Sequence, residues 1–205
     1  MYIPKLYRSD DEVLMKKIIR KHGFALLISC REKLAATHAM FLLKEKPDHF
    51  YLETHISKAN PQADVLQNGD EVLCDFLGKH AYISSSWYNH LNVSTWNYEA
   101  VQVRGTVQLM TDDELYAHLA GLTAQYEMKQ KCPVLVEDMG EAFVQEEMKG
   151  AFGISVIPTE IHIASKLSQN RKQTDFRNII AELEQGSEGE REIAAKMRKL
   201  LQESH

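Results

Sequence analysis

The sequence has few cysteines, and the three that it has stand far apart. Cys30, Cys74 and Cys132 form no CxxC pair, so their spacing indicates neither a disulfide framework nor a zinc ribbon. We expect all three to be small buried apolar residues. The histidines are also scattered without the spacing of metal ligands, so we expect no metal site.

Long apolar runs are absent as well. No run approaches the roughly 20 residues that a membrane helix requires. The first residues, MYIPKLYRSDDE, lack the apolar centre of a signal peptide. We therefore expect a cytoplasmic protein that makes no use of a membrane. Its 205 residues are enough to bury one good core.

An excess of positive charge is also missing, since the formal net charge is −5. The chain therefore has no overall basic surface for nucleic acid, and DNA binding would require a local patch or a basic partner. The best candidate patch for DNA contact is Lys16, Lys17, Arg20 and Lys21. It lies near the end of a predicted helix, where the helix dipole alone also favours cations.

Several common catalytic motifs do not occur. The sequence contains no GxxxxGK[ST], GxGxxG, GxSxG or HExxH. Phosphate-loop, dinucleotide-binding, serine-hydrolase and zinc-protease functions therefore have no support from a motif. No residue stands out as a catalytic acid, base or nucleophile, so the catalytic residues are unknown and we lean towards a protein that is not an enzyme.

The pattern of apolar residues predicts a mainly β protein with peripheral helices. Capping boxes at Ser9–Glu12 and Thr111–Glu114 each predict the start of a helix, and Asn60-Pro61 predicts a third. Further helices are expected at 141–149, 175–184 and beyond Ser187. Strands are predicted at 24–29, 34–43, 49–55, 71–77, 80–84, 98–110 and 153–167. Because short turns join most of these strands, they favour an antiparallel barrel (class α+β) over a parallel sheet.

The stretch THISKANPQ, residues 54–62, has the chemistry of an anion site. A strand ends here, Ser57 and Lys58 follow, and a helix begins at Asn60-Pro61. The hydroxyl, the ammonium and the free N–H groups of the helix could all face one phosphate. The alternative is a capped helix beside a solvated lysine.

The stretch of residues 80–101 holds both tryptophans, Trp87 and Trp96, together with Tyr82 and many polar residues. Placed on an irregular loop, these rings could flank a planar heterocycle, and Asn97 could hydrogen-bond its rim. The alternative is a loop whose aromatic residues form their own small core over the mouth of the barrel.

A third stretch, SKLSQNR at 165–171, gathers hydrogen-bond donors directly after a strand. Polar clusters at such positions often contact ligands, although a solvated turn is the alternative. Together the three stretches describe a site for a flat ring with a phosphate tail. FMN fits this description, and so does pyridoxal phosphate, but no lysine is singled out to receive an aldehyde.

Five motifs in this order resemble the PaiB family: MYIPK, THISKANPQ, AYISSSWY, STWNYEAVQVRG and KLSQNR. The resemblance runs from Met1 to about Arg171. The family is described as FMN-binding negative transcriptional regulators linked to protease production and sporulation. The resemblance therefore implies an FMN-binding split barrel, and a homodimer with flavin at the subunit interface.

The resemblance also implies roles for individual residues. Ser57 and Lys58 would bind the phosphate, Thr37 and His38 would line the flavin, and Lys166, Ser168 and Gln169 would reach it from across the site. With the three stretches, the predicted cofactor-binding residues are Thr37, His38, His55, Ser57, Lys58, Asn60, Tyr82, Trp87, Trp96, Asn97, Lys166, Ser168, Gln169 and Asn170.

Three functions stay open at this point. The first is the PaiB-type transcriptional repressor, with DNA as a partner. The second is an FMN-dependent oxidoreductase or flavin reductase, and the third is a flavin or haem binder without catalysis. We expect residues 1–171 to form the split-barrel domain. Residues 172–205 would then be a helical extension, packed on the barrel or on the partner subunit.

Overall fold

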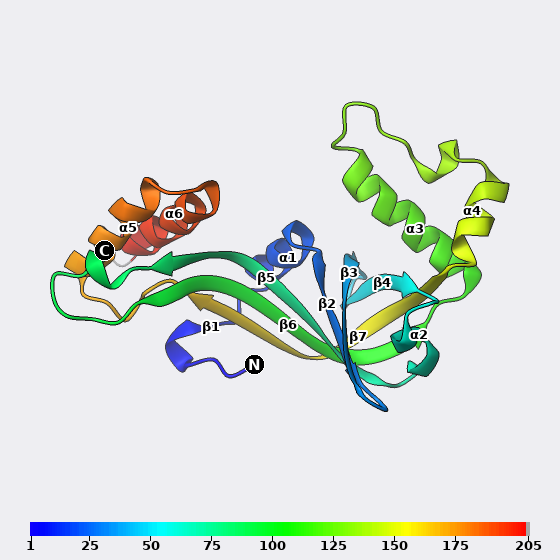
Figure 1. Cartoon of the computed structure of the whole chain (residues 1–205), viewed down its shortest axis with the longest axis horizontal. Coiled ribbons are helices and arrows are strands. Elements are labelled where there is room, and N and C mark those ends of the chain that lie inside the picture. The colour runs from blue at the N-terminus through cyan, green and yellow to red at the C-terminus, as the bar shows by residue number, and fades with distance from the viewer. Residues whose placement is uncertain (204–205) are drawn as a thin grey trace. The chain divides into compact units, whose positions relative to one another are not determined.

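The computed structural model describes residues 1–203, and its central feature is an antiparallel sheet of seven strands (Figure 1). The strand order is β1-β7-β4-β3-β2-β5-β6, and pairing of β7 with β6 closes six of the strands into a barrel, with β1 added on β7. The bounds are β1 (Arg8–Ser9), β2 (Phe24–Cys30), β3 (Leu34–Glu45), β4 (Phe50–Ser57), β5 (Glu71–Ile83), β6 (Thr95–Leu109) and β7 (Ala151–Lys166). The predicted fold class, a mainly β split barrel with peripheral helices, is confirmed.

Six helices accompany the strands. They are α1 (Glu12–Lys21), α2 (Pro61–Val65), α3 (Asp112–Glu127), α4 (Glu141–Met148), α5 (Gln173–Glu184) and α6 (Glu188–Glu203), with short 3₁₀ turns at Lys5–Tyr7, Ser85–Trp87 and Val136–Asp138. Within residues 1–203, no helix combines the length and the apolar character needed to cross a membrane.

The barrel interior follows from the two-residue period of the strands. Successive side chains on a strand point to opposite faces, so every second residue can enter the core. Leu27, Phe41 and Phe76 are among the fully buried residues, and the rings of Phe41 and Phe76 meet edge to face with centroids 5.2 Å apart. Cys74 is buried in the same core.

Two of the expectations about cysteine are wrong. Cys30 and Cys132 are exposed. Cys30 is the last residue of β2 and lies on its outer face, and Cys132 lies in the loop that follows α3. Neither cysteine side chain packs in the core, so its apolar character does not determine where the residue lies in the fold.

Asp11, not Ser9, caps the first helix. The Asp11 carboxylate accepts hydrogen bonds from the backbone N–H groups of Val13 (2.9 Å) and Leu14 (3.0 Å). Ser9 lies in β1, paired with Ile163, so the chain is still extended there and the helix begins later. The predicted box at Thr111 is confirmed, because Thr111 and Glu114 exchange both hydrogen bonds.

The two strands predicted at 71–77 and 80–84 are one continuous strand, β5. Gly78, which suggested a break, is required for a different reason. A Cβ atom at this position would lie 2.9 Å from the carbonyl oxygen of Glu99 on β6. The glycine therefore allows a close approach of two backbones rather than a turn.

Two compact units share the strands β5, β6 and β7. One unit, termed the sheet unit, comprises residues 19–76 and 102–161, and it holds β2, β3 and β4 with α2, α3 and α4. The other, termed the tail unit, comprises residues 1–18, 77–101 and 162–205. In the tail unit α5 and α6 pack beside each other on one apolar cluster with Ala81, Ile83 and Leu167 (Figure 1). A domain boundary at residue 171 stays a prediction.

We predict that Gly105→Ala destabilises the sheet unit. A Cβ atom on Gly105 would collide with the carbonyl oxygen of Ile157 and lie 2.7 Å from the Val156 side chain, and a backbone neighbour cannot turn aside. Overpacking of this kind costs about 1–3 kcal/mol. Thermal unfolding followed by circular dichroism would measure the loss. Gly189→Ala is the control, since a Cβ there meets nothing within 4 Å; equal melting temperatures for both variants would contradict the prediction.

Candidate functional site

The corner after β4 offers a hydroxyl and a cation to solvent. Ser57 and Lys58 are both exposed. The Ser57 hydroxyl accepts a hydrogen bond from the backbone N–H of Ala59 (3.1 Å), while the Lys58 ammonium has no ion pair within residues 1–203. The Lys58 backbone N–H donates to the Gly150 carbonyl (2.8 Å), which holds the corner against the start of β7. This arrangement leaves the charge of Lys58 available to an anion.

The start of α2 differs from the prediction, because its free donors are largely taken. The Asn60 side chain accepts from the backbone N–H of Gln62 (2.9 Å) and so caps the helix. The Asn60 amide group donates to the Thr37 hydroxyl (2.8 Å), and that hydroxyl donates to the Gln62 side chain (2.7 Å). Thr37 and Asn60 thus belong to an internal network rather than to an open anion site.

Gln62 is the centre of this network, and sequence reasoning missed it. Its side chain is 2% exposed and also donates to the Ser29 hydroxyl (2.8 Å). A buried amide with both of its ends hydrogen-bonded fixes α2 against β2 and β3. The only signal in the sequence is the presence of polar residues, such as Ser29 and Thr37, at inward positions of two strands.

Thr37 and His38 lie on opposite faces of β3, as adjacent strand residues must. Thr37 is half-buried and faces inward, whereas His38 is exposed and stacks on Phe24, with ring centroids 5.5 Å apart. Phe24 is itself 66% exposed. Only His38 of the two is therefore placed to meet a ligand on the outer surface.

His55 faces α3 rather than open solvent. Its Nδ1 lies 3.0 Å from Nε2 of His118, and Nδ1 of His118 lies 3.4 Å from the Glu53 carboxylate. His118 is fully buried and Glu53 is 7% exposed. Burial, and then the neighbouring His118, lower the pKa of His55 to about 4. His55 is thus neutral at physiological pH, and no sequence motif marks its contact with His118.

Tyr82 and Trp96 form an exposed aromatic cluster with His80 in the tail unit. Tyr82 is 45% exposed and Trp96 51% exposed, and their rings meet edge to face with centroids 5.8 Å apart. The His80 ring lies 5.7 Å from the Trp96 ring. Tyr82 stands on β5, within the strand predicted at 80–84, whereas Trp96 stands on β6 and not on the irregular loop that the sequence suggested. Both side chains present flat apolar faces to solvent.

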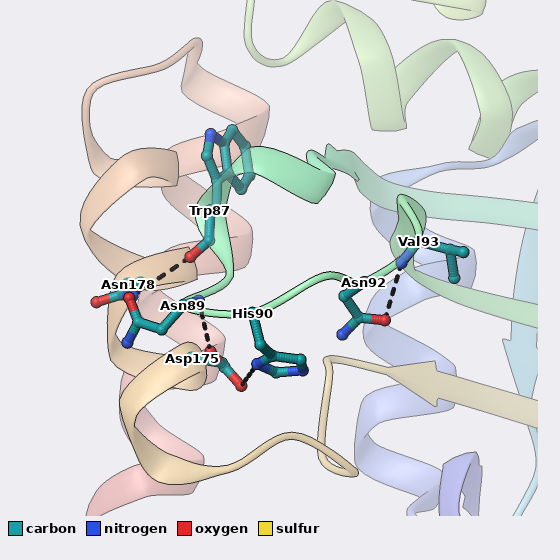
Figure 2. A network of polar contacts seen from close by, with 7 residues as sticks. All are labelled: Trp87, Asn89, His90, Asn92, Val93, Asp175 and Asn178. Carbon is teal, nitrogen blue, oxygen red and sulfur yellow. Dashed lines mark hydrogen bonds and ion pairs between the residues drawn. The ribbon is translucent and has the colours of Figure 1, made fainter.

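Trp87 belongs to a different environment. It packs against the apolar cluster of α5 and α6. Asp175 accepts from the backbone N–H of Asn89 (3.2 Å) and lies 3.6 Å from His90, and Asn178 donates to the Trp87 carbonyl (3.3 Å), as Figure 2 shows. The loop around Trp87 is therefore tied to α5, and its aromatic residues join the apolar cluster of α5 and α6 instead of forming a small core of their own.

The third predicted stretch is mostly turned inward. The Ser168 hydroxyl donates to the Asn97 side chain (2.9 Å), and the Asn97 amide donates to the Met197 sulfur (3.4 Å). Asn97 is fully buried and Ser168 is 2% exposed, with a φ of 62°. Asn97 therefore contacts α6 at Met197, and Ser168 holds the Asn97 side chain.

Lys166, Gln169 and Asn170 lie nearer to the surface. The Lys166 ammonium donates to the Thr95 hydroxyl and lies 6.0 Å from the centre of the Tyr7 ring. Burial, and then the charge of Arg171, lower the pKa of Lys166. Gln169 bonds within its own turn, to the Ser165 carbonyl (2.6 Å), and Asn170 is exposed.

The predicted cofactor residues therefore fall into two groups, one in each unit. The sheet unit holds Thr37, His38, His55, Ser57, Lys58 and Asn60, and the tail unit holds Tyr82, Trp87, Trp96, Asn97, Lys166, Ser168, Gln169 and Asn170. Ser57 and Lys58 have the donor chemistry that a phosphate needs, and the exposed rings of Trp96 and Tyr82 suit a flat heterocycle. The residues present thus fit FMN, and the contacts themselves stay a prediction.

Two further predictions concern a DNA-contact patch on α1 and metal ions. On α1, Arg20 forms an ion pair with Glu45, which offsets one charge of the Lys16, Lys17, Arg20 and Lys21 patch. Among residues 1–203, no group of three or more histidine, cysteine or acidic side chains is placed to hold a metal ion.

Similar proteins share both the sequence and the fold. Residues 1–160 match the family described as "Putative FMN-binding domain". The chain is 36% identical over 185 residues to the protease synthase and sporulation protein PAI 2 of Bacillus subtilis, a match that covers 90% of this chain and 89% of that protein.

Two solved structures have the same fold at low sequence identity. One is the FAD and haem binding protein of Mycobacterium smegmatis, with a TM-score of 0.57 and 14% identity over 78% of this chain and 73% of that one. The other is the flavocytochrome Anf3 of Azotobacter vinelandii, with a TM-score of 0.53 and 15% identity over 86% of this chain and 78% of that one. Since the family profile covers residues 1–160 and the Bacillus relative matches along 90% of the sequence, this chain belongs to the PaiB family, whose members carry the FMN-binding domain.

Proposed function

We propose that this protein binds FMN and acts as a PaiB-type negative regulator of transcription in the cytoplasm, in the control of protease production and sporulation. The name of the Bacillus relative supports the biological role. The observation that carries the flavin part is the exposed corner of Ser57 and Lys58 within the matched family domain.

The phosphate of FMN would bind at this corner. A phosphate needs a cation and hydrogen-bond donors, and the Lys58 ammonium has no carboxylate partner within the described residues. The Ser57 hydroxyl lies beside it and can donate while it accepts from Ala59. His38 offers a ring on the outer face of the same unit. When bound, the flavin supplies the capacity to accept or donate electrons, and the chain's own residues bind and orient it.

We also propose a homodimer that forms through the outer face of β2 and β3. Phe24, Leu34 and Met40 are 66%, 73% and 38% exposed. The pairing of Phe24 with Met40, and of Cys30 with Leu34, places these side chains at the two ends of one face, with the half-buried Leu26 and Ile28 between them. Exposed apolar side chains on one face are typical of an interface. The exposed rings of Tyr82 and Trp96 would then be the contribution of the second copy to the flavin ring.

A flavin-dependent oxidoreductase is the second candidate function. The solved structures with this fold are named as flavin and haem proteins, which favours redox chemistry or simple cofactor binding. No side chain in the described chain has the environment of an obvious acid or base near the corner, so we place the regulator first. Steady consumption of NAD(P)H by the protein with added FMN would reverse this order, and a spectral change without turnover would indicate a binder alone.

We predict that Lys58→Ala weakens FMN binding by at least about tenfold, because one charge-assisted hydrogen bond to phosphate is lost. Titration of flavin fluorescence would measure the dissociation constant. Riboflavin, which lacks the phosphate, should bind wild type and variant equally. Lys33→Ala removes an exposed lysine from the turn after β2 and serves as the control. Equal affinity of wild type and Lys58→Ala for FMN would contradict the phosphate site.

We predict that Leu34→Glu converts the dimer to a monomer, because two buried carboxylates would face each other across the interface. Size-exclusion chromatography with light scattering would measure the mass. Leu91→Glu changes a fully exposed leucine in the tail unit and should leave the dimer intact. A monomeric wild type, or a dimeric Leu34→Glu variant, would rule out this interface.

For DNA, we predict that the protein binds fragments from upstream of protease and sporulation genes. We also predict that Lys17→Ala lowers the slope of log K against log[salt] by about one, because one phosphate contact is lost. Gel-shift titrations over a range of salt concentrations would measure the slope. Lys33→Ala again serves as the control. Equal binding to any sequence, or none, would argue against direct repression.

A further inference from the structure

A cavity lies in the sheet unit, apart from the predicted flavin residues. It has a volume of about 310 Å³ and is bounded by the β3–β4 hairpin, by α3, and by residues of β6 and β7. The residues that matter for its chemistry are Lys44, Lys46, Tyr51, Glu53, Gln108 and Glu114. None of these belongs to the predicted flavin set. The volume is at the lower end of the range for ligand pockets, which suits one small metabolite.

The register of the hairpin explains why charged groups line this cavity. Tyr51 and Glu53 lie on one face of β4, and His49 directly precedes the strand. Lys44 pairs with Tyr51 across the hairpin, and the Lys46 backbone N–H donates to the His49 carbonyl (2.8 Å). The lysines therefore lie toward the hairpin end, and Glu53 lies further along β4 beneath α3. Charges of opposite sign thus line one cavity.

The acidic part of the cavity has acceptors that are not fully used. Glu53 is 7% exposed, yet its Oε2 has no hydrogen bond and lies 3.4 Å from His118 and 3.7 Å from the Lys44 ammonium. The Glu114 carboxylate accepts the backbone N–H and the hydroxyl of Thr111 through Oε2 alone. The Glu53 side chain also interacts with the Tyr51 hydroxyl, and Glu114 is exposed. The buried Oε2 atom of Glu53, which has no hydrogen bond, favours a donor, and an ammonium has three.

The basic part of the cavity holds an ammonium group without an ion pair in the described chain. The Lys46 ammonium lies 5.2 Å from the centre of the Tyr51 ring and has no ion pair in the described chain. Burial, then the charge of Glu53 and a hydrogen bond to the Glu53 side chain, raise the pKa of Tyr51, so its hydroxyl keeps its proton and is directed at Glu53. The side-chain amide of Gln108 adds another donor at this cavity. A carboxylate group would match these donors.

We propose that this cavity binds an α-amino acid or a similarly small zwitterion, with its ammonium toward Glu53 and Glu114 and its carboxylate toward Lys46 and Gln108. A simple anion would bring a second negative charge beside two carboxylates. A polyamine would bring positive charge beside Lys44 and Lys46. Since a poorly compensated charge in a half-buried site is costly, a molecule with both charges fits best. The proposal goes beyond the proposed function and does not require FMN.

The test is a binding screen of flavin-free protein against each standard L-amino acid at millimolar concentration. Isothermal titration calorimetry should give saturable binding for at least one of them. The methyl ester of that amino acid keeps the amine and loses the anion, and its N-acetyl derivative does the reverse. We expect both derivatives to bind at least tenfold more weakly.

Two variants test the residues. Lys46→Ala removes an exposed cation, so the fold should survive, and we expect the dissociation constant to rise about tenfold. Lys129→Ala is the matched control, since Lys129 also lies over a tyrosine ring, that of Tyr126 at 5.9 Å, but outside the cavity. Glu53→Gln should weaken binding of the ligand's ammonium group, and we expect a similar rise in the dissociation constant.

Each contrary outcome overturns the proposal in a recognisable way. Binding of none of the standard L-amino acids would exclude the ligand class. Full binding of the N-acetyl derivative would indicate a simple anion site, and full binding of the ester would indicate an amine site. Unchanged affinity in Lys46→Ala would place the ligand elsewhere. Because the screen uses protein without flavin, failure of the FMN site would not affect its result.

Discussion

The alternation of side chains along β4 (Phe50–Ser57) is the constraint on which the functional features of the sheet unit depend. Leu52, Thr54 and Ile56 point inward and are buried in the barrel. The residues between them point outward, so the cavity residue Glu53, the histidine contact of His55 and the corner residue Ser57 follow one another along a single face. A slip of one residue in the register of β4 would exchange these two sets and destroy both the core and the site.

Buried polar side chains in the sheet unit differ in how completely they are hydrogen-bonded. This difference distinguishes residues with a structural role from residues that are candidates for ligand binding. Gln62 has hydrogen bonds to Thr37 and Ser29, and these bonds fix α2 against the barrel. Glu53 has no such complete set, although it is almost as deeply buried. Unsatisfied buried groups are costly to stability and are often retained for function. The contrast is why we assign a ligand to the cavity and none to the interior of the barrel.

The sequence predicted most of the fold because the signals for strands and helix starts are local. Two-residue alternation, the capping box at Thr111 and the Asn60-Pro61 helix start were all read correctly. The errors came from long-range contacts. Gly78 predicts a break between two strands because the backbone of Glu99, which lies beside it, is distant in the sequence. Ser9 predicts a helix cap because its pairing with Ile163 leaves no local signal.

The candidate site was predicted in part, for the same reason. The corner of Ser57 and Lys58 has a local motif that predicts a phosphate site, and this role stays a prediction, whereas His118 and Gln62 carry no motif and act only through distant partners. The most direct measurement of the central claim is a crystal structure of the protein grown with FMN. The account predicts the flavin phosphate within hydrogen-bonding distance of the Ser57 hydroxyl and the Lys58 ammonium. A phosphate bound elsewhere, or a corner occupied only by solvent at saturating FMN, would contradict it.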